Sequence, residues 1–380
     1  MNNGLFYTTG TNSKNCVIES KENVKIAGFD LDYTLIKTKS GNIFPVSFND
    51  WKPLYNNISQ ILHQYIKNGY IIVIFTNQLK LNDETISQFT NKIENIMLHF
   101  NIPSDKYCYY ISFLNNGYRK PMTGMYDVFL SSNNIITISN NSFYCGDAGG
   151  RVFINSSRKK DHSITDYYFA LNTKLKFKYP EEIFNQKMDL YYRDDPYIEK
   201  SLSIWAYDKQ KIPWKEINNF NNKNGPKIVI MVGCPASGKS TLAKTIVKKY
   251  KSDDYQYYSL DVQKTKMKKL VEQSFNSSQN MIIDNTNPNI LYRQKYYNDN
   301  YHKLVLYFDY PRDLCHHLNN YRTQKSINKT KISQIVYNIY YKHLVVPKIE
   351  ESNNLTIITI TPNMIIPKID DSKFRYFYDI

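Results

Sequence analysis

The chain has 380 residues, 42% of them hydrophobic, and a formal net charge of +15. This length predicts two domains, and the charge favours an acidic partner, with nucleic acid ahead of an anionic membrane. No apolar run is long enough to span a bilayer, and the amino terminus lacks the basic-then-apolar pattern of a secretory signal.

Five scattered cysteines form no CxxC pair. This arrangement argues against a disulfide framework and against a zinc site, and it favours an intracellular, reducing compartment. No separate interface element is visible, so we expect a monomer.

In the first half, apolar runs alternate with segments whose apolar residues recur at helical spacing. Strands are expected at 24–31, 70–75, 107–112 and 143–146, with helices near 56–68 and 83–99. Such alternation predicts an α/β domain with a parallel sheet covered on both faces. Its active site is then expected at the carboxyl ends of the strands.

The pattern breaks down between about 190 and 226, where a polar, Asn-rich stretch with Gly-Pro predicts a linker. A second strand–helix alternation begins at Lys227. Strands are expected near 227–232, 280–283 and 303–308, with helices near 239–250, 312–324 and 330–344. We therefore expect an extension over 1–23, a first domain over 24–200, a linker over 201–226 and a second domain over 227–380.

Polar residues that can act on phosphate follow the strands of the first half. Asp30 and Asp32 lie two residues apart, so their side chains point to one side of an extended chain. One carboxylate can attack phosphorus and the other can protonate the leaving oxygen. Thr76 and Lys120 can bind the phosphoryl oxygens, and Asp147 adds a third carboxylate. Repulsion among these carboxylates implies Mg²⁺ held by Asp30, Asp32 and Asp147.

The second half opens with GCPASGKST, which fits the phosphate-binding pattern GxxxxGK[ST] between an expected strand and an expected helix. Successive backbone N–H groups and the helix N-terminus would surround phosphate. Lys239 would contact the β- and γ-phosphates of a nucleotide, and Ser240 would ligate Mg²⁺. The candidate nucleotide-binding residues are Gly233, Ser237, Gly238, Lys239, Ser240, Thr241 and Arg322.

Three further residues of the second half could complete a kinase. Asp261 ends an expected strand and could accept the proton of a hydroxyl substrate. Asp284 could support magnesium or substrate, or it could simply hydrogen-bond its own turn. Arg322, on a late helix and followed by basic residues, could close on the transferring phosphate, although a solvated basic helix would look the same.

The chain resembles the polynucleotide kinase 3′-phosphatase family. In the first half the resemblance is carried by FDLDYT, FTNQ, RKP, CGDAGGR, FALN and YPEEIF, and in the second by GCPASGKST, IDNTNPN, LNNYR and VYNIYYKHLVVP. It implies a haloacid dehalogenase-like phosphatase followed by a P-loop kinase.

The resemblance also implies roles. Asp30 would be the nucleophile and Asp32 the general acid/base. Mg²⁺ would bind Asp30, the Asp32 carbonyl and Asp147, and Asp261 would be the base for a 5′-hydroxyl. The expected partner is nucleic acid with 3′-phosphate or 5′-hydroxyl ends, DNA being favoured over RNA, with functional coupling to a ligase.

This sequence departs from the family at Leu260, where members often carry Arg. Lys264 could supply the missing contact to the substrate phosphate. Arg151 and Asp284 are further candidates for substrate binding. Two other functions stay open at this point: a small-molecule kinase fused to a metabolite phosphatase, and a non-catalytic nucleic-acid-binding scaffold.

Overall fold

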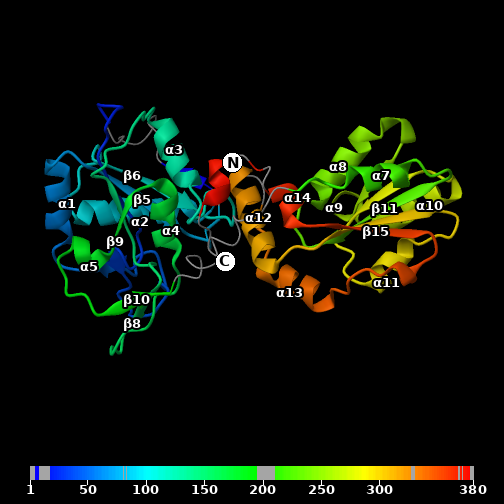
Figure 1. Ribbon diagram of the computed structural model, residues 1–380. Coiled ribbons are helices and arrows are strands. Elements are labelled where there is room, and N and C mark those ends of the chain that lie inside the picture. The colour runs from blue at the N-terminus through cyan, green and yellow to red at the C-terminus, as the bar shows by residue number, and fades with distance from the viewer. Residues whose placement is uncertain are drawn as a thin grey trace. The chain divides into compact units, whose positions relative to one another are not determined.

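The computed structural model describes residues 5–7, 18–79, 81–82, 84–194, 210–326, 330–366, 369 and 371–376 (Figure 1). The chain divides into two compact units. The first contains Met1–Glu199, Asn320–Lys331 and Arg375–Asp379, and the second contains Lys200–Asn319, Ile332–Phe374 and Ile380. Both units are α/β, as the sequence predicts.

The first unit is built on a six-stranded sheet in the order β1-β6-β5-β2-β7-β9. Its strands are β1 (Leu5–Tyr7), β2 (Ile26–Phe29), β5 (Ile71–Asn77), β6 (Tyr107–Ser112), β7 (Phe143–Cys145) and β9 (Lys176–Lys178). The strands from β6 to β9 pair in parallel, and Ala27 of β2 is in register with Ile72 on one side and Phe143 on the other. The edge strand β1 runs antiparallel to β6.

Helices pack on both faces of this sheet because successive side chains of a strand point to opposite sides. Ala27 lies in a core with α1 (Ile58–Lys67) and α2 (Ile86–His99). Its neighbour Ile26 lies in a separate core with α3 (Gly124–Ser132) and α4 (Thr165–Thr173). The unit also contains the short elements β3 (Ile36–Lys37), β4 (Lys52–Pro53), β8 (Arg151–Phe153), α5 (Pro180–Ile183) and β10 (Tyr191–Arg193).

The second unit is built on a five-stranded sheet in the order β12-β13-β11-β14-β15, with every pairing parallel. Its strands are β11 (Lys227–Gly233), β12 (Gln256–Ser259), β13 (Met281–Asp284), β14 (His302–Phe308) and β15 (Leu355–Ile360). All seven residues of β11 are buried, which fits a central strand covered on both faces.

The helices of the second half are α7 (Trp214–Asn221), α8 (Lys239–Lys249), α9 (Leu260–Gln263), α10 (Met267–Asn276), α11 (Ile290–Arg293), α12 (Arg312–Lys325), α13 (Gln334–His343) and α14 (Pro362–Ile365). Short 3-10 turns lie at Lys251–Asp253, Lys264–Lys266, Gln294–Tyr296, Ile349–Glu351 and Ser372–Arg375. Within the described ranges, no helix is both long and apolar enough to cross a membrane.

Two segments differ from the expectation. Residues 214–221, inside the predicted linker, form α7, and Ile217 and Phe220 on this helix are buried. The apolar residues of this segment recur at helical spacing, but the many Asn residues among them make that spacing hard to recognise in the sequence. In the predicted extension, Leu5–Tyr7 forms β1, with Leu5 buried against the sheet. Residues 195–209, which hold the start of the predicted linker, lie outside the described part of the chain.

Candidate active sites

The carboxyl edge of the first sheet collects the side chains that the sequence singles out. Asp30 directly follows β2, Thr76 is the penultimate residue of β5, and Asp147 follows β7. Lys120 comes from the loop between β6 and α3. The backbone N–H of Asp30 donates to the carbonyl of Cys145 at 2.8 Å, which joins the ends of the neighbouring strands β2 and β7.

Lys120 and Asp30 form the centre of this site. The Lys120 ammonium lies 2.6 Å from Oδ1 of Asp30, and both residues are buried. Burial raises the pKa of Asp30, although attraction to Lys120 opposes the shift. Burial alone would lower the pKa of Lys120, but attraction to Asp166 and Asp30 outweighs it, so the net shift is upward. Lys120 therefore keeps its positive charge beside Asp30, the proposed nucleophile.

Asp30, Asp147 and Asp166 gather carboxylate oxygens within 4.8 Å of one another. Burial, with repulsion from Asp166 and Asp30, raises the pKa of Asp147 well above its ordinary value. A divalent cation would relieve that repulsion, so the donor set fits a hard metal ion. Asp166, at the start of α4, is the member that sequence reasoning missed.

Asp32 lies at the more open side of the site, with its side chain 38% exposed. The amide of Gln78 donates both to Oδ2 of Asp32 at 2.7 Å and to Oγ1 of Thr76 at 2.9 Å. Lys92 lies 3.6 Å from the other oxygen of Asp32. Gln78 thus orients two predicted site residues, Asp32 and Thr76. Gln78 was not singled out from the sequence, although it lies in FTNQ, one of the stretches that carry the family resemblance.

Arg151, a candidate for substrate binding, is only 2% exposed. Its guanidinium pairs with Asp161 at 2.9 Å and with Glu181 at 3.0 Å, and it donates to the carbonyl of Asp147 at 3.1 Å. In this position Arg151 supports the loop that carries Asp147. Its contact with substrate stays a prediction.

The phosphate-binding loop of the second unit joins β11 to α8, as the sequence predicts. Gly238 has φ of +92°, a left-handed conformation that glycine adopts without strain. A Cβ on Gly233 would lie 2.7 Å from Cβ of Phe308, so only glycine fits there. The Ser237 hydroxyl is buried and, within the described residues, has no hydrogen-bond partner. A phosphate oxygen would satisfy it.

Lys239 is buried in this loop and donates to the carbonyl of Cys234 at 2.6 Å. Burial lowers its pKa, and the charges of Asp284 and Asp261 act in the opposite direction. Ser240 and Thr241, which follow in α8, are exposed.

Asp284 ends β13 beside the phosphate-binding loop and is 5% exposed. Its Oδ2 accepts a hydrogen bond from the Tyr257 hydroxyl at 2.5 Å. Burial and this bond raise the pKa of Tyr257 to about 12. The following turn docks on β11, since Gly233 N–H donates to Thr286 O at 3.1 Å and Asn287 donates to Met231 O at 2.8 Å.

The remaining kinase candidates lie on helices and turns. Asp261 is exposed on α9, directly after β12, and Lys264 is exposed at the start of the next 3-10 turn. Arg322 lies near the end of α12, in the segment Asn320–Lys331 that groups with the first unit. Its role in ATP binding stays a prediction.

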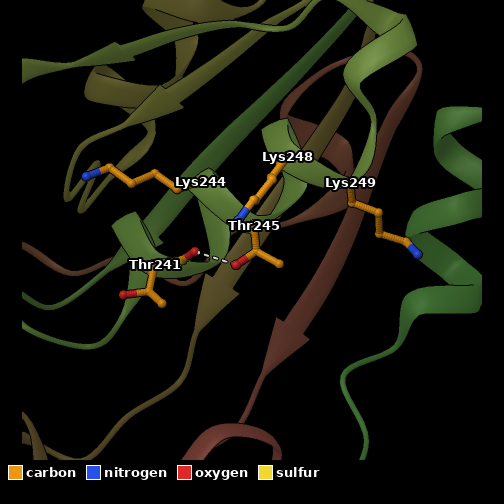
Figure 2. Close-up of a pocket in the computed structure, with 5 residues that line it drawn as sticks. All are labelled: Thr241, Lys244, Thr245, Lys248 and Lys249. Atoms are coloured by element: carbon orange, nitrogen blue, oxygen red, sulfur yellow. Dashed lines mark hydrogen bonds between the residues drawn. The ribbon is translucent and has the colours of Figure 1, made fainter.

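An open groove of about 490 Å³ runs along the exposed side of α8. Figure 2 shows the five side chains that line it, Thr241, Lys244, Thr245, Lys248 and Lys249. The Thr245 hydroxyl donates to the carbonyl of Thr241 at 2.8 Å, one turn earlier. Lys244 lies 6.0 Å from the centre of the Tyr257 ring, and Lys249 lies 5.3 Å from that of Trp214. The groove is basic and begins beside the phosphate-binding loop.

Comparison with known proteins finds relatives named for the two activities that the resemblance implies, a polynucleotide phosphatase and a polynucleotide kinase. Residues 25–184 match the family described as "Polynucleotide kinase 3 phosphatase". A "Putative bifunctional polynucleotide phosphatase/kinase" of Acanthamoeba polyphaga mimivirus is 31% identical over 386 residues, covering 93% of this chain and 88% of that protein. This chain belongs to the bifunctional polynucleotide phosphatase/kinase family.

Two further relatives cover the chain differently. The "Bifunctional polynucleotide phosphatase/kinase" of Schizosaccharomyces pombe is 28% identical over 372 residues, covering 94% of this chain and 84% of that protein. The "Polynucleotide 3'-phosphatase" of Saccharomyces cerevisiae is 32% identical over 218 residues, covering 43% of this chain and 88% of that protein. The family expected from the sequence is confirmed.

Three residues of the two candidate sites escaped sequence reasoning. Asp166 follows Asp147 by many residues, and Tyr144 lies within the apolar strand β7. Tyr257 lies within β12. Each reaches its site through tertiary contacts, so no spacing in the sequence marks it.

Proposed function

We propose that this chain heals broken nucleic-acid strands, removing a 3′-phosphate in the first unit and phosphorylating a 5′-hydroxyl in the second. One observation carries the proposal. A buried Asp30–Lys120 centre and a phosphate-binding loop lie in a single chain that aligns over 93% of its length with the mimivirus protein. The net charge of +15 suits a substrate approached through its phosphate backbone.

In the phosphatase, Asp30 attacks phosphorus and forms an aspartyl-phosphate. Lys120 compensates the negative charge of the transferring phosphoryl group, and Thr76 donates to one of its oxygens. Asp32, oriented by Gln78, protonates the leaving 3′-oxygen and then takes a proton from the attacking water. Asp32 is more exposed than Asp30, which supports this assignment of roles, because the proton donor must reach both the leaving group and water.

Mg²⁺ suits the first site because Asp30, Asp147 and the carbonyl of Asp32 offer hard oxygen ligands at one edge of the sheet. When bound, it would neutralise the crowded carboxylates and the phosphate oxygens. In the kinase, the Ser240 hydroxyl is the proposed Mg²⁺ ligand, with Asp284 in support.

In the kinase, the backbone of the loop before α8 surrounds the phosphates of ATP, and Lys239 contacts the β- and γ-phosphates. Asp261 accepts the proton of the 5′-hydroxyl as that oxygen attacks the γ-phosphate. Lys264 binds the phosphate of the substrate strand in place of the Arg that Leu260 replaces.

We further propose DNA rather than RNA as substrate, a monomeric enzyme, and coupling to a ligase through its healed product ends. The thiols of Cys145, Cys234 and Cys315 are free, which supports the proposal of a reducing compartment inside the cell.

The test is a nicked duplex with a 3′-phosphate and a 5′-hydroxyl, incubated with Mg²⁺ and ATP and resolved on a denaturing gel. Asp30→Asn should lose only 3′-phosphate removal, and Lys239→Ala should lose only 5′-phosphorylation. Glu84→Gln and Lys251→Ala, at exposed positions outside both sites, are the matched controls. If the wild type changes neither end, on DNA or RNA, but acts on free nucleosides or sugar phosphates, the proposal is wrong. Binding without turnover would indicate a scaffold.

A further inference from the structure

The ammonium of Lys120 is held by three groups rather than by Asp30 alone. It donates to Oδ1 of Asp30 at 2.6 Å, to Oδ1 of Asp166 at 2.7 Å and to the hydroxyl oxygen of Tyr144 at 2.7 Å. A lysine ammonium has three protons to donate. All three are therefore directed by named partners, and the direction of the ammonium toward Asp30 depends on the other two.

Tyr144 is fixed in turn. Its ring is fully buried in β7, 4.8 Å from the ring of Phe169 and 6.3 Å from that of Phe75. Its hydroxyl accepts from Lys120 and donates to Oδ1 of Asp166 at 3.0 Å. The hydroxyl also lies 3.5 Å from the carbonyl oxygen of Phe75. Since aromatic packing fixes the ring and these polar contacts fix the hydroxyl, Tyr144 can hold the lysine ammonium in place.

Asp166 connects this arrangement to the loop that carries Asp147. Its Oδ2 accepts from the backbone N–H of Ala148 at 3.1 Å. Its carboxyl also packs on Gly146, where an added Cβ would lie 2.4 Å from the Asp166 carboxyl carbon. One carboxylate thus sets both the ammonium of Lys120 and the backbone next to Asp147.

We propose that Tyr144, acting with Asp166, is a positioning residue for phosphate hydrolysis that aims the Lys120 ammonium at Asp30 and the transferring phosphoryl group. This inference rests on the proposed phosphatase activity and names a residue of the same site. Among the described residues, the hydroxyl of Tyr144 bonds Lys120, Asp166 and the carbonyl of Phe75, and no hydrogen bond joins it to Asp30. Its effect on the reaction passes through Lys120, and a small displacement of an aligned charge is costly in rate.

The test compares Tyr144→Phe, Lys120→Met and the double variant with the wild type. Tyr144→Phe keeps the ring and removes only the hydroxyl. We expect kcat for 3′-phosphate removal to fall about tenfold with KM nearly unchanged, because the interaction matters most in the transition state. Kinase activity of the same molecule should be unaffected. In the Lys120→Met background the second change should have little further effect, because the group it positions is gone.

Tyr110→Phe is the matched control. It removes another buried hydroxyl from the same sheet, one that accepts from Asn133 at 3.3 Å. The inference is overturned if Tyr144→Phe keeps wild-type kcat, if Tyr110→Phe lowers kcat equally, or if the effects of Tyr144→Phe and Lys120→Met simply multiply. If instead the wild type removes no 3′-phosphate, it is the proposed function that fails.

Discussion

Arg293 and Glu351 form a two-pronged ion pair in the second unit. The guanidinium of Arg293 is fully buried, and its Nε lies 2.8 Å from Oε2 of Glu351 while Nη2 bonds the other oxygen. The Tyr297 hydroxyl donates to the same Oε2 at 2.7 Å. This pair joins α11 to the 3-10 turn that precedes β15.

Glu351→Gln should destabilise the second unit, because it leaves a buried guanidinium without its counter-charge. Breaking such a pair from one side costs about 3 kcal/mol. Urea unfolding, followed by hydrogen exchange of peptides from β11 and β14, measures the change. The neighbouring Glu350→Gln, at an exposed position, is the control. Equal stability of the two variants would contradict the prediction.

The contribution of Glu351 should depend on pH. Burial alone raises its pKa, but the bonds from Arg293 and Tyr297 outweigh burial, so the pKa is lowered. A carboxyl with a lowered folded-state pKa stabilises fully above its unfolded pKa, about 4.3. That contribution is lost as pH falls through the folded-state value. The stability gap between wild type and Glu351→Gln should therefore be constant from about pH 7 to 5 and shrink below about pH 4. If the stability difference between wild type and Glu351→Gln grows as the pH falls, the lowered pKa of Glu351 is not its cause.

Much of the fold is visible in the sequence because buried parallel strands read as uninterrupted apolar runs. The runs at β5 and β11 end directly before polar clusters, and this placed Thr76 and the phosphate-binding loop correctly at strand ends. The same reasoning placed Asp30 and Asp147 just after strands, where the structure has them. The carboxyl ends of parallel strands lie at one edge of the sheet, so residues far apart in the sequence meet there. The position of each residue just after a strand was therefore enough to predict that these residues lie close together.

The rest depends on contacts that leave no local pattern. Tyr144 looks like an ordinary core residue of an apolar strand, and only its hydroxyl reaches the site. Asp166 opens a helix, where an acidic residue is expected for the helix dipole alone. The helix α7 was missed because Asn lowers the apolar contrast on which helical periodicity depends. Such features follow from tertiary packing.

Asp147→Asn should abolish the response of the first unit to magnesium while stabilising the metal-free protein. The change removes one of three crowded carboxyl groups, so it relieves repulsion and deletes a proposed ligand at once. In the wild type, Mg²⁺ at one hundred times its Kd should add about 2.7 kcal/mol. Thermal unfolding without ATP, with and without MgCl2, measures both effects. Asp105→Asn, in a surface pair with Lys106, should leave the magnesium response intact. A full response in Asp147→Asn would remove this residue from the metal site.

The groove along α8 should contribute to binding of the polynucleotide. Lys244 and Lys248 line it on the exposed side of the helix (Figure 2), and this helix starts at the phosphate-binding loop. If each neutralises one backbone phosphate, replacing both by Gln should weaken binding and reduce the slope of log K against log salt. The expected reduction is about 0.7 for each contact to a single strand and about 0.9 to a duplex.

Fluorescence anisotropy of a labelled oligonucleotide across a salt series measures that slope. Lys295→Gln with Lys342→Gln is the matched control, since it removes the same charge from exposed positions outside the groove. If both pairs of substitutions lower affinity equally, only the net charge of the protein matters. If only the groove pair changes the slope, the strand lies along α8. That result would give the substrate a path that starts at the proposed ATP site.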